Sequence, residues 1–143
     1  MKKKKYSDNF KSQVKKQSEY NNILSVFADY AATGIWIDGA CADYDELSNL
    51  GFDDDICQAV IPMLEQYQNL YESFDFWSED ADYEKTYKLP AYKEYIRLGE
   101  DIFKILSNNS PEQIMVEYLD ERTGIRYILI NDKFVAKEDS CLN

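Results

Sequence analysis

Carboxylates are the side chains of this chain with the most evident capacity for chemistry, and they are concentrated in one segment. Between Gln17 and Glu84 there are sixteen acidic residues and no Lys or Arg, whereas about eight basic residues would be expected at the average frequency of the chain. Carboxylates can ligate a divalent cation, transfer protons in pairs, or attract a positively charged partner. The absence of compensating positive charge favours the third of these roles.

Catalysis is not favoured by the other residue types. The chain contains no His, the residue that most often transfers protons near neutral pH. Its 27 acidic residues form so many carboxylate pairs that none is informative, and its five glycines form no phosphate-binding motif. Cys57 follows three Asp residues that would raise its pKa, which favours a structural role. We therefore expect a protein that is not an enzyme and uses no cofactor.

Three acidic runs contain the oxygen ligands that Ca²⁺ and Mg²⁺ prefer. These runs are Asp43-Tyr44-Asp45-Glu46, Asp53-Asp54-Asp55 and Asp80-Ala81-Asp82. None has the spacing of an EF-hand loop, in which an Asp-rich run containing Gly is followed by a Glu. We expect adventitious cation binding at these runs rather than a dedicated metal site.

Aromatic residues are interleaved with acidic residues after Glu72. This segment contains Phe74, Phe76, Trp77 and Tyr83. Aromatic anchors surrounded by charges are typical of protein interfaces, where the rings supply affinity and the charges supply steering and register. We expect Phe74 in the core, and Trp77 and Tyr83 on the surface. In the alternative interpretation Trp77 also covers the core, and the acidic residues only face water.

Apolar periodicity predicts the elements that must position these residues. It indicates three main helices, at about residues 8–33, 53–74 and 90–106. The run of Asp residues at 53–55 caps the second helix. Pro62 should kink or split this helix, and of the two we expect a kink. Pro90 is a favourable first residue for the third helix.

The C-terminal part of the chain predicts strands. Two apolar runs, at about 113–119 and 125–131, flank a loop containing Gly124, which is the pattern of an antiparallel β-hairpin. A further short strand is compatible with the apolar residues around Trp36. The predicted fold class is α+β, with the helices packed on the hairpin. We expect residues 1–143 to form a single acidic domain with a short basic N-terminal tail, since residues 1–16 contain seven Lys.

Localisation is predicted from three negative observations. The N-terminal lysines lead into polar residues rather than the apolar run of a secretory signal, and no stretch reaches about 18 apolar residues, as a membrane span requires. The three Cys residues are odd in number and contain no CxxC pair, so a disulfide framework is not expected. We expect a cytoplasmic protein.

Four segments between residues 34 and 120 resemble small bacterial immunity proteins, which accompany polymorphic toxins, including those of contact-dependent growth inhibition systems. These segments are Gly34-Ile35-Trp36-Ile37-Asp38-Gly39, the turn with Leu47 and Leu50, Tyr67-Gln68-Asn69-Leu70-Tyr71-Glu72, and Val116-Glu117-Tyr118-Leu119-Asp120. The resemblance implies a cytosolic inhibitor that binds a toxin domain, often a basic nuclease, and covers its active site.

Charge and resemblance together predict a basic toxin domain as the partner, and no direct contact with nucleic acid or membrane. Trp77 and Tyr83 would anchor the contact. The carboxylates that would pair with Lys and Arg of the toxin are Asp43, Asp45, Glu46, Asp53, Asp54, Asp55, Asp80 and Asp82. An alternative function is a nucleic-acid mimic that inhibits a restriction or CRISPR nuclease by placing carboxylates where phosphates would lie. A third class, an enzyme that uses carboxylates and a divalent metal, would require a metal-dependent activity.

Overall fold

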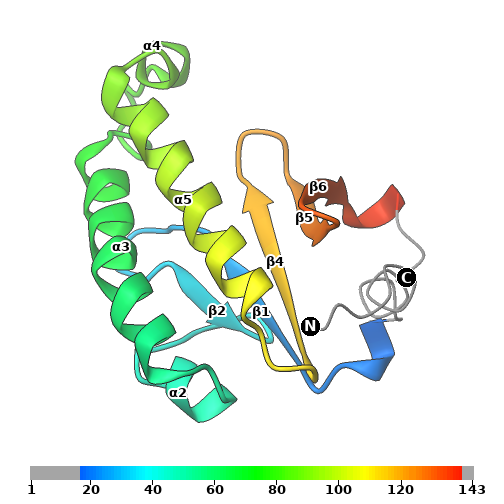
Figure 1. Ribbon diagram of the computed structural model, residues 1–143. Helices are drawn as coiled ribbons and strands as arrows, with labels where there is room; N and C mark the ends of the chain where they lie inside the picture. Colours follow the sequence, from blue (N-terminus) through cyan, green and yellow to red (C-terminus); the bar gives the residue numbers. More distant parts are fainter. Residues whose placement is uncertain (1–16, 140–143) are drawn as a thin grey trace.

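A computed structural model describes residues 17–139 of the chain as a mixed sheet with helices on one face (Figure 1). The strands are β1 Asn22–Val26, β2 Ile35–Ile37, β3 Ala40–Cys41, β4 Ile114–Asp120, β5 Ile125–Ile130 and β6 Lys133–Ala136. The helices are α2 Glu46–Leu50, α3 Asp54–Ser73, α4 Tyr83–Tyr87 and α5 Pro90–Asn108, with 3-10 turns η1 Gln17–Glu19 and η2 Lys137–Asp139. The α+β fold class predicted from the sequence is therefore confirmed.

The sheet has the strand order β3-β2-β1-β4-β5-β6. Its two central strands, β1 and β4, run parallel, and the other neighbouring pairs are antiparallel. Parallel neighbours require a crossover connection, and here the connection contains all four α-helices. The centre of the sheet thus pairs the first strand of the described chain with β4, which follows the last α-helix.

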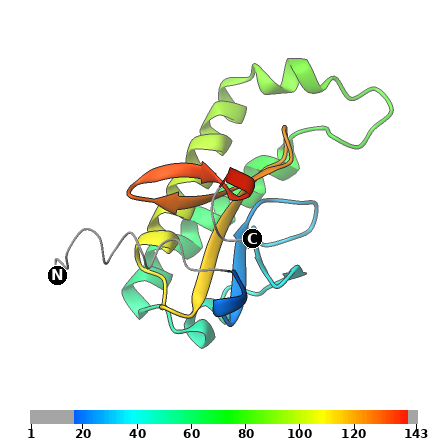
Figure 2. The ribbon, with the colours of Figure 1, turned by 90° about the vertical axis from the view of Figure 1, so that its right-hand side faces the viewer.

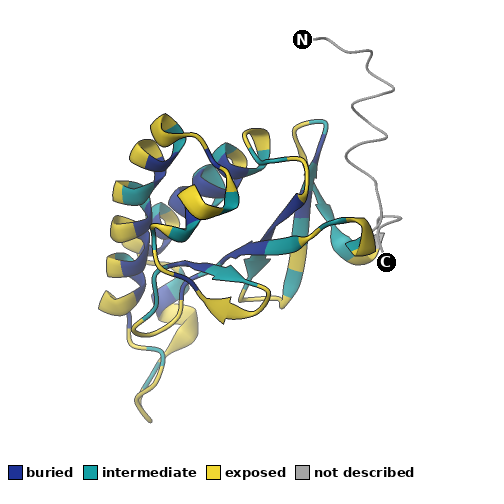
Figure 3. Ribbon diagram, turned by 90° about the horizontal axis from the view of Figure 1, so that it is seen from below, coloured by how far each residue is buried: buried dark blue, intermediate teal, exposed yellow. Residues whose placement is uncertain are grey.

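Two long helices cover one face of this sheet. α5 packs against β4, and α3 lies against α5, so the buried sides of both helices face the core (Figure 3). Gly99 makes this approach possible, because a Cβ atom there would lie 2.6 Å from Cε1 of Tyr67. The Tyr67 ring in turn stacks on Tyr95 with ring centroids 4.7 Å apart. The helix pair is therefore held by aromatic packing over a glycine.

The predicted helices at 53–74 and 90–106 are confirmed as α3 and α5, with ends that differ by at most two residues. Asp53 occupies the N-cap position of α3, and Pro90 begins α5. Helix α3 runs through Pro62 without being split. The short helix α4 was not predicted from the sequence, although Asp82 caps it by accepting a hydrogen bond from the Lys85 amide.

The predicted helix at 8–33 is wrong for residues 17–33, and residues 8–16 lie outside the described part. Residues 22–26 form the central strand β1, in which Leu24 and Val26 are fully buried and Ser25 points to the opposite face. Apolar spacing can fit both periods in so short a segment, and pairing with strands on both sides decided for the strand. Gly34 has the positive φ expected of a helix stop, but it precedes β2 and packs against Leu64 and Tyr67.

The predicted hairpin at 113–119 and 125–131 is confirmed as β4 and β5, with Tyr118 opposite Tyr127. The sheet continues beyond it to β6 through a tight turn, in which Asn131 and Asp132 have φ values of 51° and 68°. Asn and Asp adopt this conformation more readily than most residues, so the Asn-Asp pair is a turn signal in the sequence. Of the strand or turn that the apolar residues around Trp36 allowed, the structure has the strand, β2.

The other face of the sheet carries a second, smaller buried cluster. Met115, Ile128 and Ile130 form it, with Ile23 and Val135 packed alongside. Next to this cluster lies the buried carboxylate of Glu117, which accepts hydrogen bonds from Ser25, Arg126 and Lys137. A buried charge is stable when it is paired in this way.

Candidate functional site

The predicted partner-binding residues form two groups at opposite ends of α3. Helix α3 has 20 residues, so its ends lie about 30 Å apart. One group is beside α2 and the first turn of α3: Asp43, Asp45, Glu46, Asp53, Asp54 and Asp55. The other lies in the connection from α3 to α4: Trp77, Asp80, Asp82 and Tyr83. The structure therefore does not bring the ten predicted residues into one compact site.

The first group is a surface of exposed carboxylates without aromatic anchors. Asp43, Asp45 and the run Asp53–Asp55 are exposed, and Glu46 is half-buried. Neither Asp45 nor Asp53 uses its side chain as a helix cap, although both hold the N-cap position. Among residues 17–139, no group of three or more acidic or Cys side chains is arranged to hold a metal ion. This end of α3 has charge for steering a partner, but no ring to anchor one.

The second group contains the exposed aromatic residues that the sequence predicted. Trp77 is 53% exposed and Tyr83 is 49% exposed, whereas Phe74 is buried. The connection that carries them extends away from the rest of the fold (Figure 2). It is nevertheless held in place, because Asp75 accepts hydrogen bonds from the Ser78 amide and hydroxyl, and Tyr83 donates one to the Phe76 carbonyl.

Tyr30 completes this surface and was not predicted as a site residue, because its segment was predicted to be helical. It is the most exposed large apolar residue described, at 65%, and its ring meets the Trp77 ring edge-on with centroids 4.8 Å apart. Its loop joins β1 to β2 and docks on α3: the Ala31 amide donates to Glu72, and Gln68 donates to Glu72 and to the Asp29 carbonyl. No local sequence signal pairs residues 30 and 77, because the contact depends on this docking.

We define the aromatic–acidic surface as Tyr30 and Trp77 together with the acidic residues of the β1–β2 loop, the end of α3 and the connection to α4. These acidic residues are Asp29, Glu72, Asp75, Glu79, Asp80 and Asp82. All are exposed, and the nearest basic residues in sequence are Lys85 of α4 and Lys88, which follows the end of α4. Two aromatic rings in contact, surrounded by carboxylates, can hold a ligand that is partly apolar and partly cationic.

A second candidate lies on the other side of α5, where tyrosine side chains meet Glu121. Tyr95 donates a hydrogen bond of 2.7 Å to Glu121, just after the end of β4. Burial raises the pKa of Glu121 to about 7, although the hydrogen bond from Tyr95 opposes this rise. Glu121 as a whole residue is exposed. The loss of water therefore concerns its carboxyl group, which lies against Tyr95. A carboxyl group with a pKa near neutrality can change charge under physiological conditions.

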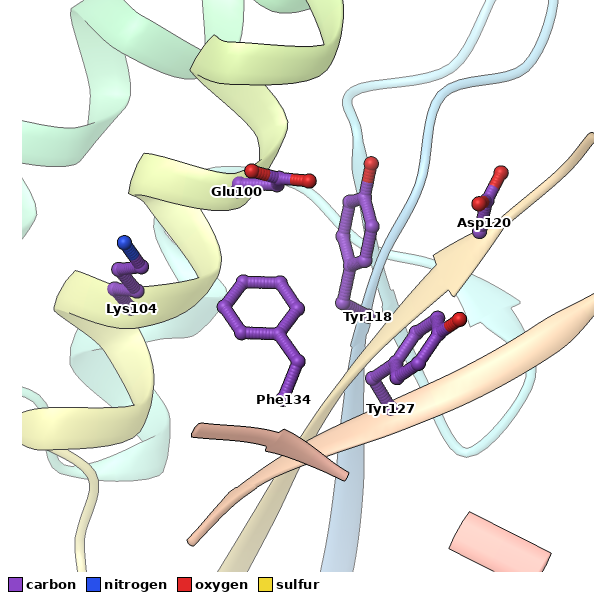
Figure 4. Close-up of a pocket in the computed structure, with 6 residues that line it drawn as sticks. All are labelled: Glu100, Lys104, Tyr118, Asp120, Tyr127 and Phe134. Atoms are coloured by element: carbon purple, nitrogen blue, oxygen red, sulfur yellow. The ribbon is translucent and has the colours of Figure 1, made fainter. Parts of the chain in front are cut away.

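Below Glu121 a pocket of about 440 Å³ opens between α5 and strands β4, β5 and β6. Figure 4 shows Glu100 and Lys104 reaching it from α5, and Tyr118, Asp120, Tyr127 and Phe134 from the strands. None of these six residues was predicted from the sequence as a site residue. Tyr118 and Asp120 are two residues apart and so share one face of β4, but no local pattern in the sequence indicates that they meet Tyr127, Phe134 and the residues of α5.

Comparisons of this chain with protein-family models, with curated proteins and with solved structures found no match. None of the helices within residues 17–139 combines the length and the apolar character that a membrane span requires.

Proposed function

We propose that this protein binds a basic protein through the aromatic–acidic surface, and that the partner is the toxin domain of a polymorphic toxin, which it neutralises as an immunity protein. The observation that carries the proposal is the exposed contact between Tyr30 and Trp77 within a segment that has sixteen acidic residues and no Lys or Arg. The toxin class comes from the resemblance to immunity proteins and from the charge that a nuclease needs in order to hold phosphate.

The surface is suited to tight binding because it is already organised. Loops that become ordered only on binding lose affinity through the entropy of ordering. Here Gln68 and Glu72 hold the loop of Tyr30, and the hydrogen bonds of Asp75 and Tyr83 hold the connection of Trp77. Exposed aromatic rings within such a frame are typical of binding hot spots.

The charge would act mainly on the rate of association. Opposite net charges raise the association rate by tenfold or more at low salt, in rough terms, and affinity then depends on the anchors. The acidic group beside α2 would add to this field from the other end of α3. On this proposal the acidic residues guide the toxin to this protein. The two rings then hold the complex together, with the active site of the toxin covered.

The test begins with identifying the partner in lysate of the source strain with the tagged protein, followed by binding measurements on the purified toxin domain. We expect Trp77→Ala and Tyr30→Ala to weaken binding at least tenfold and to abolish protection of cells that express the toxin. Leu89→Ala is the matched control, because Leu89 is 41% exposed but lies outside the surface. Equal affinity for all three variants would disprove the proposed surface.

The same experiment separates the proposal from nucleic-acid mimicry. A mimic would be displaced from its target by added DNA or RNA, and its target would be a defence enzyme of the host. A toxin partner whose activity is inhibited stoichiometrically, and which distinguishes this protein from unrelated acidic proteins, supports the immunity function.

A further inference from the structure

The pocket between α5 and the C-terminal strands is walled by three aromatic rings. The Phe134 ring lies near both of the others, with its centroid 6.2 Å from Tyr118 and 6.1 Å from Tyr127. The rings are inclined to Phe134 by 70° and 54°, so they line the pocket as walls rather than forming a closed stack. The faces of aromatic rings carry partial negative charge and attract cations.

Two carboxylates stand on either side of the Tyr118 hydroxyl, Glu100 from α5 and Asp120 from β4 (Figure 4). Asp120 is paired with Arg122 at 3.2 Å. Glu100 has no salt-bridge partner among the described residues. Burial raises the pKa of its carboxyl group, and the charge of Lys104, one helical turn away, lowers it. A half-buried carboxylate without a close partner is costly, and a cationic group would relieve that cost.

The pocket already interacts with one cation of its own. The Lys104 ammonium lies 5.8 Å from the centroid of Phe134, which is within the range of a cation–π interaction. Lys104 is exposed and one helical turn from Glu100, so its side chain can move into water when another cation takes its place. This contact shows that the Phe134 ring accepts a positive charge from the α5 side.

We propose that this pocket binds an organic cation, an ammonium or guanidinium group, between the rings of Tyr118, Tyr127 and Phe134 and beside the carboxylate of Glu100. The source of the group is either a free small molecule or a Lys or Arg side chain of another protein. The volume of about 440 Å³ lies within the range of ligand pockets and accommodates such a group with several carbon atoms. This inference does not depend on the proposed toxin partner, because the pocket does not include the aromatic–acidic surface.

The test is an NMR titration of the full-length protein with n-propylguanidinium and n-butylammonium chloride, with n-butanol as the neutral probe and NaCl as the ionic-strength control. We expect the NMR chemical shifts of Tyr118, Tyr127 and Phe134 to change with each cation until they saturate, with Kd in the millimolar range. Shifts that do not saturate by about 100 mM, or that n-butanol reproduces, would overturn the proposal.

Two substitutions should change the affinity in opposite directions. Glu100→Gln removes the attracting charge and should weaken cation binding about fivefold, whereas Lys104→Met removes the competing cation and should strengthen it about threefold. The matched controls are Glu65→Gln on α3 and Lys93→Met on α5, which make the same charge changes at exposed positions outside the pocket. Equal effects of each variant and its control would mean that only net charge matters, and this would overturn the site.

A final comparison distinguishes the two sources of the cation. The capped tripeptide acetyl-Gly-Arg-Gly-amide is titrated beside n-propylguanidinium. Tighter binding of the peptide supports the proposal with a protein side chain as ligand, because the backbone then adds contacts. Tighter binding of the free cation supports it with a small molecule as ligand. Binding of neither contradicts the proposal.

Discussion

Ser25 and Glu117 are 92 residues apart in the sequence, yet the Ser25 hydroxyl donates a 2.5 Å hydrogen bond to the Glu117 carboxylate across the parallel pair at the centre of the sheet. Arg126 of β5 and Lys137 of η2 donate to the same carboxylate. One buried acidic group thus ties β1, β4, β5 and the C-terminal turn together.

We expect Glu117→Gln to lower the free energy of unfolding by about 3 kcal/mol, because it leaves two cations beside a buried position without their counter-charge. Ser25→Ala should cost about 1 kcal/mol, the usual effect of losing one hydrogen bond. Urea unfolding measures both, with Glu65→Gln as an exposed control that should remain within about 0.5 kcal/mol of the wild type. Wild-type stability of Glu117→Gln at neutral pH would contradict this role.

The pH dependence of this contribution has a defined sign. Burial by itself would raise the pKa of Glu117, but the hydrogen bonds from Lys137 and Ser25 and the charge of Arg126 lower it below its ordinary value of 4.5. The folded protein therefore holds this proton less tightly than the unfolded chain. The stabilisation is present above about pH 4.5 and is lost as the pH falls through the lower folded-state value.

Glu121 should make the stability of the protein depend on pH in the opposite direction. Its pKa is about 7 in the folded protein against 4.5 ordinarily, so the folded state binds the proton more tightly and stability falls as the pH rises between these values. Glu121→Gln should therefore stabilise the protein at about pH 8 by about 1 kcal/mol, a figure reduced from the full shift because the residue is exposed. Thermal unfolding at about pH 5 and pH 8 measures this, and a gain that is the same at both values would exclude titration of Glu121 as the cause.

Gly99 is predicted to resist substitution although it lies inside a helix. Ala is favoured over Gly in helices by about 1 kcal/mol, but its Cβ would lie 2.6 Å from Cε1 of Tyr67, in a stack that also contains Tyr95. Overpacking of this kind typically costs 1–3 kcal/mol, roughly, so we expect Gly99→Ala to destabilise the protein on balance. Chemical denaturation measures the change, and a stabilised variant would show that the Tyr67 ring can move away without loss.

Trp77 is predicted to matter for binding and not for folding. Because it is 53% exposed, Trp77→Ala should change the free energy of unfolding by less than about 1 kcal/mol while it raises the dissociation rate of the partner. Raising the salt concentration should instead lower the association rate and leave dissociation nearly unchanged. Stopped-flow kinetics with the purified partner separates the two effects, and an association rate that is independent of salt would contradict electrostatic steering.

Local patterns predicted the elements whose signals lie within one segment. Helix α3 has a capping Asp53 and a long apolar stripe, α5 begins at Pro90, and the β4–β5 hairpin has Gly124 in its turn, so each was recognisable by itself. Strand β1 was mistaken for a helix because its five residues are too few to separate the two periods. Its conformation is decided by hydrogen bonds to β2 and to β4, and β4 begins 88 residues after the end of β1.

The candidate sites divide in the same way. That Trp77 and Tyr83 are exposed among acidic residues was predicted, because composition alone identifies an aromatic segment with no positive charge. The partner of Trp77 was not, since Tyr30 reaches it only when the β1–β2 loop docks on Gln68 and Glu72. The ten residues predicted to bind the partner fall into two groups, which a helix of 20 residues holds apart.

The sequence by itself determined the charge of this protein, its α+β composition and the two long helices, because these depend on residue type and on periodicity over many neighbouring residues. Only the tertiary structure decided the central parallel strands, the buried Ser25–Glu117 contact and the pocket beneath Glu121. Each of these joins residues from separate elements, and the free energy that holds them together arises from packing and pairing that exist only in the folded chain.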